Sequence, residues 1–341
     1  MISVVICTHN GARKIANALR ALGNQTMSSF ETIVVDDGSS DGVGEVVGGY
    51  PVRYLRMEQN VGLSAARNAG VAAAGGEIIA FCDDDCVPEP EWVERIAAVW
   101  EKAEPGVMGI GGGVRAWSTY SIAQRYADAT SPLAPLESTG GGVVARLWAY
   151  LSGPRREGES RWVKSLVGAN MSYRRTALEA VGGFDPAIKF GGDEEVLCQR
   201  LRERYGEECL WFVPQIVMKH EFDERLTDTF RRARAYGRGS GREWARNGGI
   251  PSVRPGIIGV IGGSGATLLW GWRRGGLGWG VVAAVVGLFT LPIAVAWHTR
   301  HGKRAERNLY PHLTILLEAA NTLGFYEGWR EWRKLHRSGY Q

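Results

Sequence analysis

Strand-like and helix-like patterns alternate along the first 81 residues of this chain. Apolar or β-branched runs predict strands at residues 2–7, 32–35, 53–56 and 77–81. Helical patterns follow the first of these runs, to about Asn24, and the third, over residues 63–73. Strands that alternate with helices form a mostly parallel sheet, so we expect an α/β fold. In such sheets ligands bind beyond the carboxyl ends of the strands.

Carboxylates collect where two of these strands end. Asp36 and Asp37 follow the second run, and Asp83, Asp84 and Asp85 follow the run at 77–81. Three adjacent acids repel one another, so we expect a cation to hold them. Hard oxygen ligands of this kind suit Mg²⁺ or Mn²⁺ bound together with the phosphates of a nucleotide diphosphate. The alternative is a solvated acidic turn that caps the next helix.

A second acidic cluster, Asp193-Glu194-Glu195, follows two glycines and precedes a helical pattern. This spacing places the three acids at a helix N-terminus, where negative charge is favourable. One of them could instead serve as a general base, since neighbouring acids raise a carboxyl pKa toward the working pH. Capping and catalysis both remain open at this cluster.

Seven motifs in order resemble family 2 glycosyltransferases of the GT-A fold. They lie at residues 4–10, 34–41, 60–68, 83–85, 167–172, 182–185 and 190–195, and so cover about the first two thirds of the chain. The resemblance implies a GT-A fold, with a Rossmann-like, mostly parallel sheet. It also implies inverting transfer of a sugar from a nucleotide diphosphate donor.

The resemblance assigns several residues to the donor nucleotide. Thr8 is expected to lie against the nucleobase pocket, Asp37 to contact the base or its ribose, and Arg67 to support the same pocket. A strand end that carries two aspartates needs donors to satisfy it, and ribose hydroxyls are such donors. An ordinary Asp-rich turn is the alternative at residues 36–38.

The acidic triplet matches the DxD motif of the family. Asp83 corresponds to the first acid, near ribose and metal, and Asp85 to the last, a direct ligand of Mn²⁺ or Mg²⁺. Asp84 is the spacer between them and is also expected on the donor side. His220 ends an apolar, strand-like run where many GT-A enzymes bring a histidine toward the metal or diphosphate; a structural role is the alternative.

The resemblance also implies an acceptor side. Family members usually carry Glu-Asp where this chain has Asp193-Glu194, so alignment on the two glycines puts Glu194 in the position of the general base. Asp193 could act instead from a shifted backbone. Gly168 and Asn170, in the motif at 167–172, are assigned to the acceptor.

The C-terminal third predicts a membrane-associated helical region. Its expected parts, after a catalytic domain at 1–224, are a basic linker helix at 225–254, a hydrophobic hairpin at 255–298 and amphipathic helices at 299–341. Residues 276–297 carry no charged side chain and are about as long as a span requires. The hairpin either spans the membrane or enters it shallowly. Basic residues on both flanks predict a cytoplasmic catalytic domain at the cell membrane.

Charge and glycine content exclude other classes. A net charge of +4 without a nucleic-acid-binding motif argues against nucleic acid as a partner, so we expect the basic segment to meet membrane lipids or an acidic, lipid-linked acceptor. The glycine triplets at 111–113 and 140–142 lack the lysine of a P-loop and are predicted to be turns.

Residues 131–161 are predicted to form a long loop that covers the acceptor. Five cysteines at unrelated spacings and the absence of a cleavable signal predict a cytosolic catalytic domain with reduced thiols.

The sequence thus predicts a metal-dependent, inverting glycosyltransferase at the cytoplasmic membrane face. Its donor is a nucleotide sugar, with a UDP-sugar as the default, and its acceptor is lipid-linked or a polysaccharide. Direct transfer to polyprenyl phosphate is the alternative within enzymes. A catalytically inactive, nucleotide-binding scaffold subunit is the alternative from another class.

Overall fold

The computed structural model describes residues 1–130, 133, 135, 159–188, 191–246, 273, 281 and 309–337. The chain divides into two compact units. The first contains residues 1–119, 131–138 and 155–222, and the second contains residues 120–130, 139–154 and 223–341. Most of the predicted acceptor loop and of the predicted hairpin lie outside the described residues.

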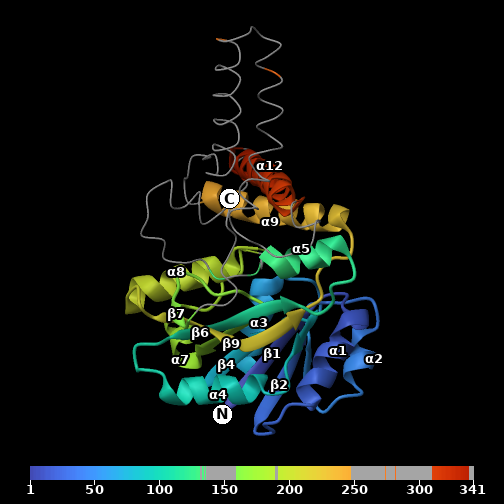
Figure 1. The fold of residues 1–341 in the computed structure, drawn as a ribbon. Helices are drawn as coiled ribbons and strands as arrows, with labels where there is room; N and C mark the ends of the chain where they lie inside the picture. The colour runs from blue at the N-terminus through green and yellow to red at the C-terminus, as the bar shows by residue number, and fades with distance from the viewer. Residues whose placement is uncertain are drawn as a thin grey trace. The chain divides into compact units, whose positions relative to one another are not determined.

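The first unit is built on one mixed sheet (Figure 1). Its parallel half contains β1 (Ile2–Thr8), β2 (Phe30–Asp36), β3 (Arg53–Arg56) and β4 (Ile78–Cys82). Its other strands are β5 (Cys86–Pro88), β6 (Gly109–Ala116), β7 (Arg161–Trp162), β8 (Asn170–Arg174) and β9 (Leu210–His220). The strand order is β3-β2-β1-β4-β8-β6-β9-β5, with β7 paired to β9. The sequence therefore predicted the parallel strands to within two residues at each end.

Alternation along β1 explains why the middle of this strand, Val4–Ile6, is apolar at every position. Val4 and Ile6 belong to a core shared with α1 (Ala12–Gly23) and α4 (Trp92–Lys102). Val5 belongs to the core on the opposite face, which also contains residues of α3 (Leu63–Ala73), α7 (Arg175–Ala180) and α8 (Asp193–Tyr205). A short helix, α2 (Val43–Val47), adds Val43 and Val47 to the first core. Because both faces of the sheet are covered, its central strands need apolar residues at every position.

The strand register brings the polar ends of the strands to one edge. Thr8 at the end of β1 pairs with Asp36 at the end of β2, and Phe81 on β4 pairs with Val5. The acidic turn at 83–85 therefore lies directly beyond β4, beside the turns that follow β1 and β2. This is the edge at which α/β folds bind ligands.

The prediction of a turn at Gly111–Gly113 is wrong, because these glycines lie inside β6. A Cβ atom at Gly112 would lie 2.1 Å from the carbonyl oxygen of Ile216 and 2.4 Å from Nδ2 of Asn170. The pairing of β6 with β9 also shifts between Gly112 and Gly113. The glycines allow close approach of neighbouring backbone at this irregularity, a role that glycine often has within strands.

The second unit contains α5 (Ile122–Thr130), α9 (Leu226–Arg246) and α12 (Tyr310–Arg337). Glycines let α9 and α12 pack closely: a Cβ atom at Gly241 would lie 2.0 Å from the carbonyl oxygen of Phe325. Gly237, Gly324 and Gly328 make equally close approaches across the same interface. Within the described residues, no helix has both the length and the apolarity needed to cross a bilayer.

Candidate active site

The three acids after β4 point to three different partners. Asp83 contacts Arg67 of α3, Asp84 contacts Thr8 of β1, and Asp85 contacts Lys14 of α1. The triplet therefore contacts three different elements, which are the strand β1 and the helices α1 and α3. Each carboxylate has its own environment, which the sequence pattern alone does not distinguish.

Asp84 is more than a spacer. Its Oδ2 atom accepts a hydrogen bond of 2.6 Å from the Thr8 hydroxyl. A Cβ atom at Gly11 would lie 2.1 Å from the same oxygen, so only glycine leaves room for this carboxylate. Burial, with the neighbouring acids, raises the pKa of Asp84 to about 7, although Thr8 and Lys14 oppose the shift.

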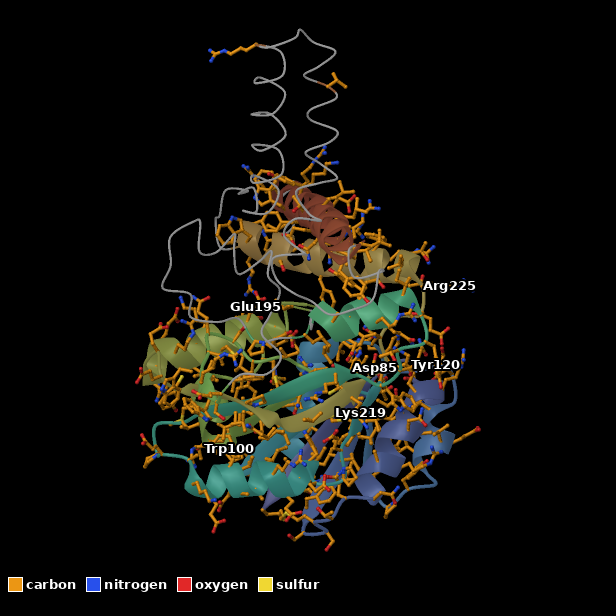
Figure 2. All side chains as sticks on the ribbon, viewed as in Figure 1. Asp85, Trp100, Tyr120, Glu195, Lys219 and Arg225 are labelled. Carbon is orange, nitrogen blue, oxygen red and sulfur yellow. The ribbon has the colours of Figure 1, made fainter. Side chains whose placement is uncertain are left out.

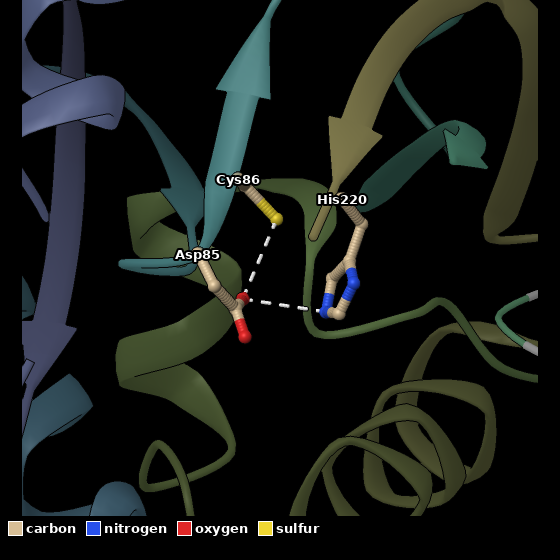
Figure 3. Close-up of side chains that lie close together, drawn as sticks. All are labelled: Asp85, Cys86 and His220. Carbon is tan, nitrogen blue, oxygen red and sulfur yellow. Dashed lines mark hydrogen bonds and ion pairs between the residues drawn. The ribbon is translucent and has the colours of Figure 1, made fainter. Parts of the chain in front are cut away.

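Asp85 lies between the ammonium group of Lys14 and the imidazole of His220. Its Oδ2 atom is 3.2 Å from Nζ of Lys14, and its Oδ1 atom is 3.3 Å from Nε2 of His220 at the end of β9. The Sγ atom of Cys86 is 4.0 Å from the same Oδ1 atom (Figure 3). The carboxylate suits Mn²⁺ or Mg²⁺ and the imidazole nitrogen can add a further ligand, whereas sulfur is a soft ligand that such hard ions do not favour. The residues present thus fit the ion that the sequence predicts.

Arg67 connects the acidic turn to the second acidic cluster. Its side chain is only 3% exposed, and its guanidinium lies 2.5 Å from Oδ2 of Asp193 and 3.4 Å from Oδ1 of Asp83. It also stacks 5.4 Å from the ring centre of Phe184. Burial lowers the pKa of Arg67, but the two aspartates outweigh this effect and raise it. Arg67 therefore serves as the shared counterion of both clusters, and the structure directs it to these acids.

The acids at the start of α8 differ in exposure. Asp193 is 1% exposed and bound to Arg67, Glu194 is half-buried, and Glu195 is exposed. Glu195 is labelled on α8 in Figure 2. Left-handed backbone at Gly191 and Gly192, with φ of 76° and 88°, turns the chain into the helix and explains the glycine pair. Burial, followed by the charge of Asp193, raises the pKa of Glu194 well above that of an ordinary glutamate.

The two acids after β2 organise the surrounding turns. The oxygens of Asp37 accept hydrogen bonds of 2.7 and 2.9 Å from the backbone N–H groups of Val61 and Gly62, just before α3. Asp36 accepts a hydrogen bond of 2.8 Å from the N–H of Ser39 and one from the Tyr54 hydroxyl. In this structure the Asp37 carboxylate therefore fixes the loop that leads to α3 and Arg67.

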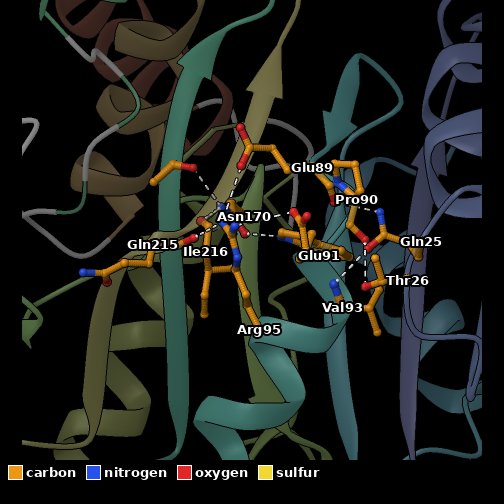
Figure 4. A network of polar contacts seen from close by, with 12 residues as sticks. Gln25, Thr26, Glu89, Pro90, Glu91, Val93, Arg95, Asn170, Gln215 and Ile216 are labelled. Carbon is orange, nitrogen blue, oxygen red and sulfur yellow. Dashed lines mark hydrogen bonds and ion pairs between the residues drawn. The ribbon is translucent and has the colours of Figure 1, made fainter.

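The residues assigned to the acceptor do not lie at an open surface. Asn170 is 2% exposed, donates hydrogen bonds to the carbonyls of Gly113 and Ile216, and accepts one from Nε1 of Trp92 (Figure 4). Both of its donors are used inside the protein, and its assignment to the acceptor stays a prediction. Gly168 is buried, and a Cβ atom there would lie 2.6 Å from Nη2 of Arg67. Glycine at this position leaves room for that guanidinium, and its assignment to the acceptor stays a prediction.

Sequence reasoning missed Lys14 and Gly11 at this site, and it missed the thiol of Cys86 that lies beside the site. Lys14 lies in the first turn of α1, which begins just beyond β1, so its place at the ligand-binding edge followed from the predicted topology. Cys86 pairs in register with His220, a partner that only the antiparallel pairing of β5 with β9 reveals.

Comparison with known proteins agrees with this architecture. The glycosyl transferase family 2 model matches residues 3–182. The glycosyltransferase AglE of Haloferax volcanii is 31% identical over 245 residues, which are 65% of this chain and 77% of that protein. The glucosyl-dolichyl phosphate glucuronosyltransferase of the same organism is 25% identical over 240 residues, 67% of this chain and 71% of that protein.

Two solved structures share the fold. The mannosyltransferase PcManGT from Pyrobaculum calidifontis, in complex with GDP-Man and Mn²⁺, has a TM-score of 0.56 at 17% identity, covering 98% of this chain and 87% of that chain. Glucosyl-3-phosphoglycerate synthase from Mycobacterium tuberculosis, in complex with Mn²⁺, UDP and glucosyl-3-phosphoglycerate, has a TM-score of 0.50 at 18% identity, with 74% and 81% covered. These likenesses show the GT-A fold.

Proposed function

Because this chain belongs to glycosyl transferase family 2, we propose that it is an inverting glycosyltransferase that uses a divalent metal ion and a nucleotide diphosphate sugar. The observation that carries this proposal is the pair of acidic clusters joined by Arg67. One cluster is suited to a metal and diphosphate, and the other contains a half-buried carboxylate with a raised pKa. In this proposal the first cluster stabilises the leaving group, and the second removes the proton of the acceptor.

Glu194 is our candidate for the general base. It takes the proton of an acceptor hydroxyl while the hydroxyl oxygen attacks the anomeric carbon and the bond to the diphosphate oxygen breaks. A raised pKa suits this task, because a base works best when its pKa is near the operating pH. Asp193 is buried in its ion pair with Arg67, so we assign it the role of positioning the start of α8.

Asp85 and His220, with Asp83 nearby, are the residues that would hold Mn²⁺ or Mg²⁺. When bound there, the ion supplies Lewis-acid stabilisation of the departing nucleoside diphosphate. Thr8, Asp37, Asp84 and Arg67 shape the donor side, with Asp37 acting through the loop before α3 and Arg67 through its ion pair with Asp83. PcManGT was solved with GDP-Man and Mn²⁺, which supports a donor and ion of these classes.

For the acceptor we propose a lipid-linked sugar or a polysaccharide at the cytoplasmic side of the cell membrane. A relative named for action on glucosyl-dolichyl phosphate and the uncharged segment at 276–297 support this choice. Transfer directly to polyprenyl phosphate is the second candidate. That acceptor is already ionised and needs no strong base.

The test begins with calorimetric titration of the detergent-purified protein with UDP, GDP and dTDP, each with and without Mn²⁺. We expect metal-dependent binding of one nucleotide, lost in Asp85→Ala. Absence of binding by all three with Mn²⁺ would contradict a donor site and would also exclude a scaffold subunit that binds one of these nucleotides.

A second measurement separates the two acceptor classes. Glu194→Gln is expected to retain nucleotide binding and to lose sugar transfer to a hydroxyl acceptor by about 10²-fold or more, the usual contribution of a general base. Transfer to polyprenyl phosphate that survives in Glu194→Gln would favour the second candidate.

A further inference from the structure

Three different donor atoms converge beside the acidic turn. Asp85 supplies Oδ1, Cys86 supplies Sγ and His220 supplies a ring nitrogen, and these atoms all lie within 4.8 Å of one another (Figure 3). The Cys86 thiol is fully buried and His220 is 4% exposed, so the group is a built cluster.

The strand register explains why the thiol and the imidazole face each other. Cys86 on β5 and His220 on β9 are direct partners in an antiparallel pair. Side chains of such partners point to the same face of a sheet, with Cβ atoms about 5 Å apart. Asp85 immediately precedes Cys86, and its carboxylate turns back toward both. The backbone register therefore places the thiol and the imidazole side by side.

This donor set differs in kind from that of a Mg²⁺ or Mn²⁺ site. Hard ions select oxygen, whereas Zn²⁺ binds cysteine sulfur, histidine nitrogen and carboxylate oxygen at about 2.0–2.3 Å. Two ligands at such distances from a tetrahedral ion lie about 3.3–3.8 Å apart. The observed separations are 3.3 Å from Oδ1 of Asp85 to Nε2 of His220 and 4.0 Å to Sγ of Cys86, so small side-chain movements suffice.

We propose that Asp85, Cys86 and His220 form a site for a soft divalent ion, Zn²⁺ in particular, with a fourth position open to water. Binding forms an S–Zn bond in place of the S–H bond and releases the thiol proton to solvent. The site shares Asp85 and His220 with the Mn²⁺ site of the proposed function. Resting on that function, we infer that Zn²⁺ excludes the activating ion and inhibits the enzyme.

Cobalt titration of the detergent-purified full chain tests the site without an activity assay. Co²⁺ bound to a thiolate gives a charge-transfer absorption in the near ultraviolet, which a site of oxygen and nitrogen ligands lacks. We expect this band to saturate at one equivalent and to disappear when Zn²⁺ is added. The band should be absent in Cys86→Ser and retained in Cys209→Ser, which alters a buried free thiol elsewhere in the first unit.

The outcomes are separable from those of the proposed function. Absence of the band in the natural sequence, or its persistence in Cys86→Ser, would overturn the zinc site. Cys86→Ser is expected to keep Mn²⁺-dependent nucleotide binding, which also shows that the variant is folded; Cys86→Ala serves if it does not fold. A cobalt–thiolate band together with no Mn²⁺-dependent nucleotide binding would leave the zinc site standing and contradict the donor site.

Discussion

At the residue scale, one arginine, Arg67, is the counterion of both acidic clusters. Arg67 and Asp193 are 3% and 1% exposed, so neither charge is compensated by water. The sequence identified both residues through their motifs, but it assigned Arg67 to the nucleobase pocket. Which groups Arg67 contacts depends on the direction of its side chain from α3, and the spacing of motifs does not encode that direction. It likewise did not reveal that Asp193 forms a buried ion pair with Arg67.

Removing the arginine should strongly destabilise the protein. We expect Arg67→Met to lower the free energy of unfolding by about 3–5 kcal/mol, because it leaves Asp193 as an uncompensated buried charge. Urea unfolding measures the loss. Arg13→Met, at an exposed position of α1, is the matched control and should change stability by less than about 0.5 kcal/mol. Equal effects of the two substitutions would show that the buried pair does not stabilise the folded protein.

Lys14 is expected to compete with the metal ion. Its Nζ atom lies 3.2 Å from Asp85, so its positive charge opposes a cation at that carboxylate. Lys14→Met should raise the affinity for Mn²⁺ in the absence of nucleotide by about tenfold, which corresponds to about 1.4 kcal/mol. Calorimetric titration with MnCl₂ is the measurement, again with Arg13→Met as control. Unchanged or weaker Mn²⁺ binding in Lys14→Met would refute the competition.

At the element scale, the sequence predicted the parallel strands well and the glycine-rich strand poorly. Continuous apolar runs are a strong signal for buried strands, and the carboxyl ends followed from them. β6 gave no such signal, because its glycines are selected by close contacts with β9 and β8 that lie far away in sequence. The partners of Asn170 could not be predicted for the same reason, since its hydrogen bonds to Gly113 and Ile216 join three strands that are far apart in sequence.

The start of β2 supplies a pH-dependent contact. Glu31 accepts hydrogen bonds from the Ser3 hydroxyl and from the N–H of Gly75. Burial raises the pKa of Glu31, but these hydrogen bonds outweigh it and hold the pKa below its ordinary value of 4.5. The contact therefore stabilises the fold above that pH, and its contribution is lost as the pH falls through the lowered pKa.

The expected result is a stability difference that depends on pH. Glu31→Gln should be less stable than the natural sequence at about pH 7, and the gap should close toward about pH 3. Urea midpoints at both pH values measure it. Glu45→Gln, at an exposed position of α2, should show no comparable gap. A gap that widens on acidification would contradict the assignment.

The crossing of α9 and α12 should not tolerate a side chain at its glycines. A Cβ atom at Gly241 would lie 2.0 Å from the carbonyl oxygen of Phe325, so the helices must separate to admit it. We expect Gly241→Ala to cost about 1–3 kcal/mol, as overpacking does. Thermal unfolding followed by circular dichroism measures the loss. Gly23→Ala, where a Cβ atom meets nothing within 4 Å, is the control and should be neutral or slightly stabilising.

At the scale of the whole molecule, the two units differ in content: the first contains the candidate site, and the second contains the packed pair of helices α9 and α12. All residues assigned here to donor, metal and base lie in the first unit. In the second, three arginines of α9 are paired with α12: Arg234 and Arg238 bind Glu327, and Arg242 binds Glu331. The sequence predicted the basic helix, but its pairing with α12 arises from residues about ninety positions apart and could not be foreseen.

This division predicts independent behaviour. Gly241→Ala should leave the affinities for Mn²⁺ and for the bound nucleotide unchanged, because no residue of the acidic site lies on α9 or α12. Titration of the detergent-purified variant beside Gly23→Ala tests this. A loss of nucleotide affinity of about tenfold or more in Gly241→Ala alone would show that the second unit contributes to the donor site.

The guanidinium shared by Asp83 and Asp193 has a thermodynamic consequence. A cation that arrives near Asp83 adds positive charge to a network that includes Glu194, and so it favours the ionised form of that carboxyl. Reciprocity then requires that a proton taken up by Glu194 weakens the hold on the cation by the same factor. If Glu194 is the base that we propose, a metal ion at the acidic turn therefore favours the ionised form of Glu194, which is the form that accepts a proton.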